Sequence, residues 1–185
     1  MINSMALERK TVKTQTLITL VAVAAALALP QLFHFIGVTS GVGPALGEAF
    51  LPMFLPVLIA GLLGGPVVGL VAGMVSPLLS YALSGMPGVV MLPNLIAELA
   101  GYGLVAGLLI NVKMPVIGKL LIAQIAGHAL KAAVILLSVY ALGNHAIPVT
   151  LIWSSVVTGL PGIILQWSLI PLIVFWANNR KNIHE

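Results

Sequence analysis

The sequence contains neither cysteine nor aspartate, and only 6% of its 185 residues are charged. Without cysteine, disulfides and thiolate metal sites are excluded, and cysteine usage says nothing about the redox compartment. Because aspartate is absent, the four glutamates are the only side-chain carboxylates available for metal binding or for paired-carboxylate chemistry. Soluble domains are about 25% charged, so this chain has too few polar residues to cover a surface that faces water.

Motifs for ATP binding and for common hydrolases are also missing. The phosphate-binding pattern GxxxxGK[ST] does not occur, and neither HExxH nor GxSxG is present. Aromatic residues make up only 6% of the chain, which argues weakly against a ligand that needs extensive ring stacking. We therefore expect no catalytic residues, no metal, no cofactor and no nucleic-acid partner for this chain.

Long apolar runs dominate what the sequence does contain. The chain is 60% hydrophobic, with 19 glycines and 12 prolines, both commoner in membrane helices than in soluble ones. A helix that crosses a bilayer needs about 20 mostly apolar residues. On this basis we predict an all-α integral membrane protein, a bundle of six transmembrane helices at 14–36, 50–64, 66–83, 89–110, 116–142 and 148–177. The second helix is short and holds Pro52 and Pro56, so it could be kinked or partly re-entrant.

The basic residues indicate how this bundle is oriented. With six spans, seven of the eight Lys and Arg residues fall on one face: Arg9, Lys10, Lys13, Lys113, Lys119, Arg180 and Lys181. The opposite connections, 37–49, 84–88 and 143–147, contain no Lys or Arg. Because loops rich in Lys and Arg stay in the cytoplasm, we predict cytoplasmic tails at 1–13 and 178–185 around one membrane domain, 14–177.

The N-terminus also allows a second interpretation. A basic start, an apolar run and an Ala-Leu-Ala tripeptide resemble a cleavable signal. The apolar run continues through LFHFIG, which is too long for the hydrophobic region of a typical signal. We therefore favour a retained first helix.

Polar residues inside the predicted spans are the candidate binding residues. Gln124, His128 and Lys131 follow an i, i+4, i+7 spacing and share a helical face, while Glu98 is the only acid within any span. A charge near the bilayer centre costs at least about 2.5–3.5 kcal/mol, so it faces a partner or a wet cavity. Glu98 and Lys131 either form a structural bridge or line a cavity that fills from outside, and we favour the cavity. The predicted binding residues are Glu98, Lys131, His128, Asn94, Gln124, Gln166 and Glu48.

The alternatives for the other polar residues stay open. Amide side chains also join membrane helices to one another, so Asn94, Gln124 and Gln166 serve either purpose. His34, at the end of the first helix, could be a simple interfacial residue. Glu48 lies in the glycine-rich connection 37–49, which together with the tight turn at 84–88 we expect to act as a lid over the cavity.

Small residues four apart mark faces where helices approach closely. For the glycine pairs Gly69–Gly73 and Gly103–Gly107 we favour packing within the bundle. The first helix carries two overlapping alanine pairs, which could instead serve a partner subunit: Ala22–Ala26 and Ala24–Ala28.

Three stretches resemble a known family. They are LPMFLPVLIAGLLGGPVVGLVAGMVSPLLSYALSGMPG, AELAGYGLVAGLL and TGLPGIILQWSLIPLIV. They are similar to the substrate-binding S components of energy-coupling factor (ECF) vitamin transporters, and the resemblance covers nearly all of 14–177. It implies a cell membrane protein of a prokaryote with an outward-facing cavity gated by the two outer connections. It also implies docking to a transmembrane T subunit, which couples to two cytoplasmic ATPases, through Ala22 and Ala26 or Ala24 and Ala28.

The resemblance also bounds the solute. The chain looks closest to the group that includes pantothenate, cobalamin and pyridoxine-type members. An unpaired Lys131 would suit an anion such as pantothenate, whereas a Glu98–Lys131 pair leaves a neutral or zwitterionic vitamin equally suitable. Two other hypotheses remain: a self-sufficient carrier coupled to protons through Glu98 and His128, and, with less support, an intramembrane enzyme.

Overall fold

The computed structural model describes residues 12–43, 45–143 and 146–182, and throughout these ranges it is helical apart from short connections. The helices are α1 (Val12–Thr39), α2 (Ala45–Phe50), α3 (Phe54–Gly64), α4 (Pro66–Ser84), α5 (Leu92–Leu108), α6 (Val116–Leu136), the π-helix η1 (Leu137–Ala141), α7 (Leu151–Thr158) and α8 (Leu160–Asn182). The described residues contain no strand, so the predicted all-α class is confirmed.

Five helical stretches are long and apolar enough to cross a membrane. They are Val12–Thr39, Ala45–Gly64, Pro66–Ser84, Val116–Ala141 and Leu160–Ala177. The predicted span 89–110 forms α5, which is apolar but has only 17 residues. At 1.5 Å per residue α5 is shorter than the roughly 30 Å hydrocarbon core. The count of six full spans therefore remains a prediction.

Two of the predicted spans are interrupted. The predicted span 50–64 contains the last residue of α2 and all of α3, separated by a turn in which Leu51 adopts a φ of 47°. Leu51 precedes Pro52, and a residue before proline is hindered from the right-handed helical conformation. Residues 148–177 divide near Gly159 into α7 and α8, with Pro161 in the first turn of α8, where proline is tolerated. A continuous helix was predicted for 148–177, so that prediction is wrong at this junction.

The tightest packing joins α4 to α5 and α3. A Cβ on Gly69 of α4 would collide with the carbonyl oxygen of Gly103 on α5, and a Cβ on Gly103 would collide with that of Gly69. A Cβ on Gly61 of α3 would lie 2.5 Å from the same Gly103 oxygen. Glycine removes the side chain that would otherwise separate these backbones. The internal role predicted for the glycine pairs is therefore confirmed.

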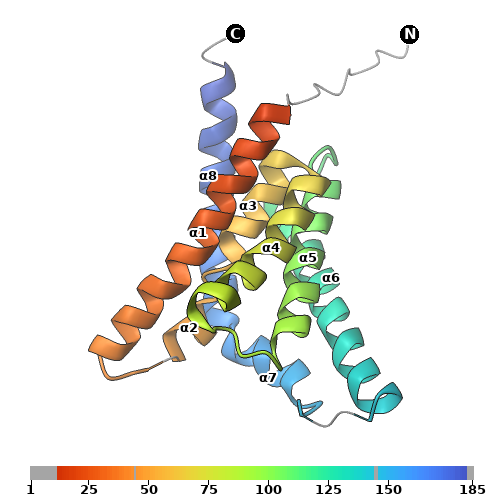
Figure 1. Cartoon of the computed structure of the whole chain (residues 1–185). Helices are drawn as coiled ribbons and strands as arrows, with labels where there is room; N and C mark the ends of the chain where they lie inside the picture. The colour runs from red at the N-terminus through yellow and green to blue at the C-terminus, as the bar shows by residue number, and fades with distance from the viewer. Residues whose placement is uncertain (1–11, 44, 144–145, 183–185) are drawn as a thin grey trace.

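The two ends of the bundle differ (Figure 1). The start of α1, the end of α8 and the α3–α4 and α5–α6 connections lie together at one end. We call this the basic end, because Lys13 lies in the first turn of α1 and Lys113 lies in the α5–α6 connection. The α1–α2 and α4–α5 connections and α7 lie at the opposite end. This arrangement matches the predicted sorting of charge.

Candidate functional site

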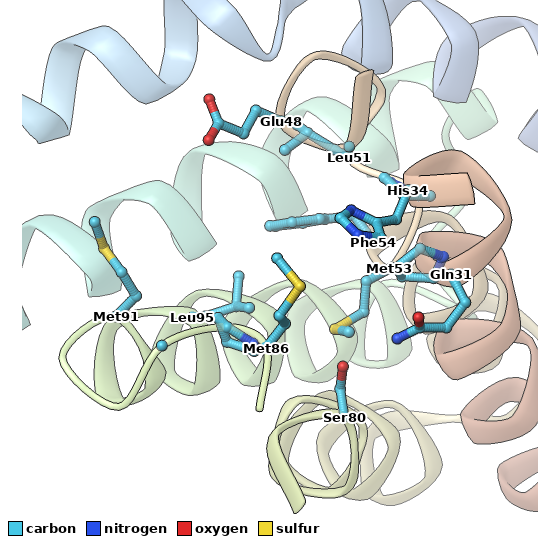
Figure 2. Close-up of a pocket in the computed structure, with 15 residues that line it drawn as sticks. Gln31, His34, Glu48, Leu51, Met53, Phe54, Ser80, Met86, Met91 and Leu95 are labelled. Carbon is cyan, nitrogen blue, oxygen red and sulfur yellow. The ribbon is translucent and has the colours of Figure 1, made fainter. Parts of the chain in front are cut away.

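A cavity of about 380 Å³ opens at the end of the bundle opposite the basic end. Segments that are distant in the sequence build it: α1, α2, the α2–α3 turn, α3, α4, the α4–α5 connection and α5. Its lining residues are Pro30, Gln31, His34, Gly47, Glu48, Leu51, Pro52, Met53, Phe54, Ser80, Met86, Pro87, Gly88, Met91 and Leu95. Figure 2 shows these side chains around the cavity. Its volume falls within the range of about 300–1,000 Å³ that is typical of small-molecule sites.

Four polar side chains line this cavity. Ser80 is 4% exposed, and its hydroxyl points into the cavity in Figure 2. That hydroxyl forms no hydrogen bond with the residues the structure describes, so it is available to a ligand. Gln31 and Glu48 are exposed at the rim, and His34 is half-buried between rim and floor. Glu48 is the one charged residue among the described lining residues, where neither Lys nor Arg occurs.

The rest of the wall is apolar and adaptable. Met53 and Phe54 are buried at the floor, while Met86 and Met91 are exposed on the α4–α5 connection. Methionine is unbranched and polarizable, so it adjusts to ligands of irregular shape. Met53 and Met91 also precede the first turns of α3 and α5, and neither helix has a side-chain cap there.

The structure brings three of the predicted residues together in a buried network between α5 and α6. Glu98 is 1% exposed. One of its carboxylate oxygens lies 2.7 Å from Nδ1 of His128, and the other lies 3.1 Å from Nζ of Lys131. The hydroxyl of Tyr102 lies 3.0 Å from Nε2 of His128. With Nδ1 donating to the carboxylate, Nε2 is left to accept a hydrogen bond from Tyr102.

Two of the predicted amides, Gln124 and Gln166, form a second buried group with Trp167. Nε2 of Gln124 donates to Oε1 of Gln166 at 2.9 Å, and Nε1 of Trp167 donates to Oε1 of Gln124, also at 2.9 Å. Among the described residues, Nε2 of Gln166 has no hydrogen-bond partner. Asn94 on α5 is also buried, at 4% exposure. The hydrogen bonds of Gln124 join α6 to α8.

Of the seven predicted binding residues, only Glu48 lines the cavity. The other six lie inside the bundle, and contact between any of them and a solute stays a prediction. Glu98 and Lys131 pair with each other, which was the structural alternative to a shared cavity. One contact connects the two regions, because the Phe54 ring at the cavity floor meets Tyr102 edge-on, with ring centroids 5.0 Å apart.

Sequence reasoning missed most of the cavity lining. Gln31 and His34 are three residues apart at the end of α1, a spacing that places them on one helical face and was the available signal. Ser80 gave no signal, because a lone serine in an apolar helix usually bonds to its own backbone. Tyr102 gave none either, since only the fold brings it to His128.

The alanine pairs of α1 face in different directions. Ala22 and Ala26 are 7% and 0% exposed and belong to the hydrophobic core of the bundle. Ala24 and Ala28 are exposed. The pair that is free to meet another subunit is therefore Ala24–Ala28.

Comparison with known proteins identifies the family. The family model described as ECF transporter, substrate-specific component matches residues 16–174. Neither the curated proteins nor the solved structures gave a match. The matched region includes every residue that lines the cavity. The chain thus belongs to the substrate-specific components of ECF transporters, and it is a multi-pass membrane subunit that binds a transported substrate.

Proposed function

We propose that the 380 Å³ cavity is where this subunit captures a vitamin. The observation that carries the proposal is a cavity with a buried, unpaired Ser80 hydroxyl at its floor and a carboxylate, Glu48, at its rim. Ser80 and His34 would bond to the inner part of the solute, while Glu48 and Gln31 would bond to its outer part. The α1–α2 and α4–α5 connections form the rim, so they are placed to close over a bound solute.

The charge distribution supports the orientation of this cavity. The basic end carries Lys13, Lys113 and Lys119 and is placed in the cytoplasm by the positive-inside rule. The cavity at the other end then opens to the exterior of a prokaryotic cell. This subunit holds no ATP-binding motif, so transport requires a transmembrane T subunit and two cytoplasmic ATPases. The T subunit would dock on the exposed Ala24–Ala28 face of α1.

Among the three predicted vitamin types, the cavity best fits a pyridoxine-type solute. Cobalamin, a corrin macrocycle with an attached nucleotide, is too large for about 380 Å³. Pantothenate is an anion and would meet Glu48 with no Lys or Arg among the described lining residues to offset the repulsion. A pyridoxine-type ring carries a basic nitrogen that suits Glu48 and a phenolic oxygen that suits the Ser80 hydroxyl.

The test is a binding measurement on purified protein without ATP. Pyridoxine, pantothenate and cobalamin are each titrated by calorimetry and by thermal shift, since a ligand of the folded state raises its stability. We expect pyridoxine to bind, and Ser80→Ala and Glu48→Gln each to raise its Kd about tenfold, the loss of one hydrogen bond of about 1.4 kcal/mol.

A matched serine provides the control. Ser76 lies one turn from Ser80, is fully buried and donates to the carbonyl of Ala72. Ser76→Ala should leave the Kd unchanged. A vitamin that binds equally well to the Ser80 and Glu48 variants would remove the cavity assignment. Folded protein that binds none of the vitamins would remove the proposed function.

A further inference from the structure

A second cavity lies toward the basic end, between the start of α6 and the stretch just past the middle of α8. Its volume is about 510 Å³, and its lining residues are all apolar: Pro115, Val116, Ile117, Pro171, Leu172, Val174 and Phe175. It shares no lining residue with the vitamin cavity. We call it the α6–α8 groove. Several of its residues are exposed, including Leu172 at 65% and Phe175 at 65%.

The depth of the groove matches the upper part of a lipid chain. Its α6 residues stand at the start of the span Val116–Ala141, and its α8 residues lie in the last two turns of the span Leu160–Ala177. We take the ends of these two spans as the membrane boundary, so the groove lies just inside it. An apolar cavity at this depth is open to the acyl chains of the surrounding leaflet.

Basic residues follow at the depth of the phosphate groups. Lys113 lies three residues before the α6 span, and Arg180 lies three residues after the α8 span. Lys113 is exposed. Lys119 is already engaged, because its Nζ donates to the carbonyl of Ile110 at 2.9 Å. From residue 99 to residue 184 the sequence contains no acid, so nothing on these two helices offsets the positive charge.

We propose that the α6–α8 groove is a binding site for an anionic phospholipid. One acyl chain occupies the apolar groove, and the phosphate lies beside Lys113. Basic pockets between helices on the cytoplasmic side of a membrane are suited to anionic head groups, and each nearby Lys or Arg contributes about fivefold in affinity. A zwitterionic lipid of the same chain length would gain affinity from its acyl chain in the groove, but its head group has no net charge to attract Lys113.

The test compares two lipids on the intact, detergent-purified protein. Phosphatidylglycerol and phosphatidylcholine with identical chains are titrated while the melting temperature is followed and bound lipid is counted by native mass spectrometry. We expect phosphatidylglycerol to bind more tightly. Lys113→Gln should weaken its binding about fivefold. Lys13→Gln removes the same charge from the same end, but on α1, and should leave the preference intact.

A groove variant separates the lipid chain from the head group. Leu172→Trp should fill the groove and weaken both lipids, while the exposed position keeps the lipid-free melting temperature unchanged. Equal binding of the two lipids, or equal losses in the Lys113 and Lys13 variants, would overturn the proposal. Stabilisation by inorganic phosphate alone would also overturn it, and so would a T subunit that occupies the groove and excludes lipid.

Discussion

At the scale of single residues, the central feature is Glu98, a glutamate that the fold buries inside the bundle. Glu98 faces two nitrogen groups of α6, from His128 and Lys131, and all three lie in the α5–α6 interface. An isolated charge there would be costly, whereas a paired and hydrogen-bonded one is tolerated. The network therefore holds α5 against α6 at the depth where neither helix could carry its charge alone.

Removing the carboxylate should destabilise the bundle more than it affects solute binding. Glu98→Gln leaves the Lys131 ammonium buried without a counter-charge, a loss of about 3–5 kcal/mol. Vitamin affinity should stay within about twofold of native, because Glu98 does not line the cavity. Denaturant unfolding in detergent and calorimetry measure the two quantities separately.

The double variant Glu98→Gln/Lys131→Met is the control for this charge effect. It removes both charges and should recover part of the lost stability. A large loss of vitamin affinity in folded Glu98→Gln would instead restore the original prediction that Glu98 contacts the solute. No recovery in the double variant would show that the ion pair does not govern stability.

At the scale of elements, the crossing of α4 and α5 depends on the absence of side chains. Gly103→Ala places a Cβ against the backbone of Gly69, where no flexible group can move aside. Overpacking of this kind costs about 1–3 kcal/mol, and the unfolding midpoint should fall accordingly. Gly118→Ala on α6 is the matched control, since its Cβ would meet only the Met114 methyl at 3.7 Å. Equal effects in the two variants would contradict the proposed close crossing.

Larger side chains on the two faces of α1 should have different effects on subunit association and on stability. Ala24→Leu/Ala28→Leu enlarges the exposed pair and should abolish co-purification with the T subunit, while vitamin binding and the melting temperature stay unchanged. Ala22→Leu/Ala26→Leu enlarges the buried pair and should lower the melting temperature through steric strain. Retained association with the T subunit in the first variant would exclude this face as the docking surface.

At the scale of the whole molecule, the absence of native cysteine makes the orientation directly measurable. Single cysteines replace Ser40 in the α1–α2 connection and Asn111 in the α5–α6 connection, both exposed. In intact cells, a membrane-impermeant maleimide should label Ser40→Cys and should reach Asn111→Cys only after the membrane is opened. The reverse pattern would place the vitamin cavity in the cytoplasm and contradict the proposed direction of uptake.

The sequence by itself determined the properties that depend on local composition. Apolar runs placed the helices, because burying about 20 apolar residues in lipid needs no tertiary partner. The positions of the Lys and Arg residues indicated the orientation, because each loop contacts one side of the membrane whatever the helices pack against. The spacing of His128 and Lys131 correctly placed them on one helical face, where both meet Glu98, whereas Gln124 bonds to α8. The glycine pairs correctly predicted close packing. The resemblance of three stretches gave the family.

Only the tertiary structure decided which of these residues meet. Ser80, Gln31 and Glu48 come from α4, α1 and α2 and share a cavity because the helices converge at one end, which no spacing within a helix reveals. Glu98 instead contacts His128 and Lys131 on α6 and does not line the cavity. The choice between the two alanine pairs of α1 likewise depended on which side α3 and α4 cover. A buried polar residue can be satisfied by a neighbour or by a ligand, and only the position of its neighbours distinguishes the two.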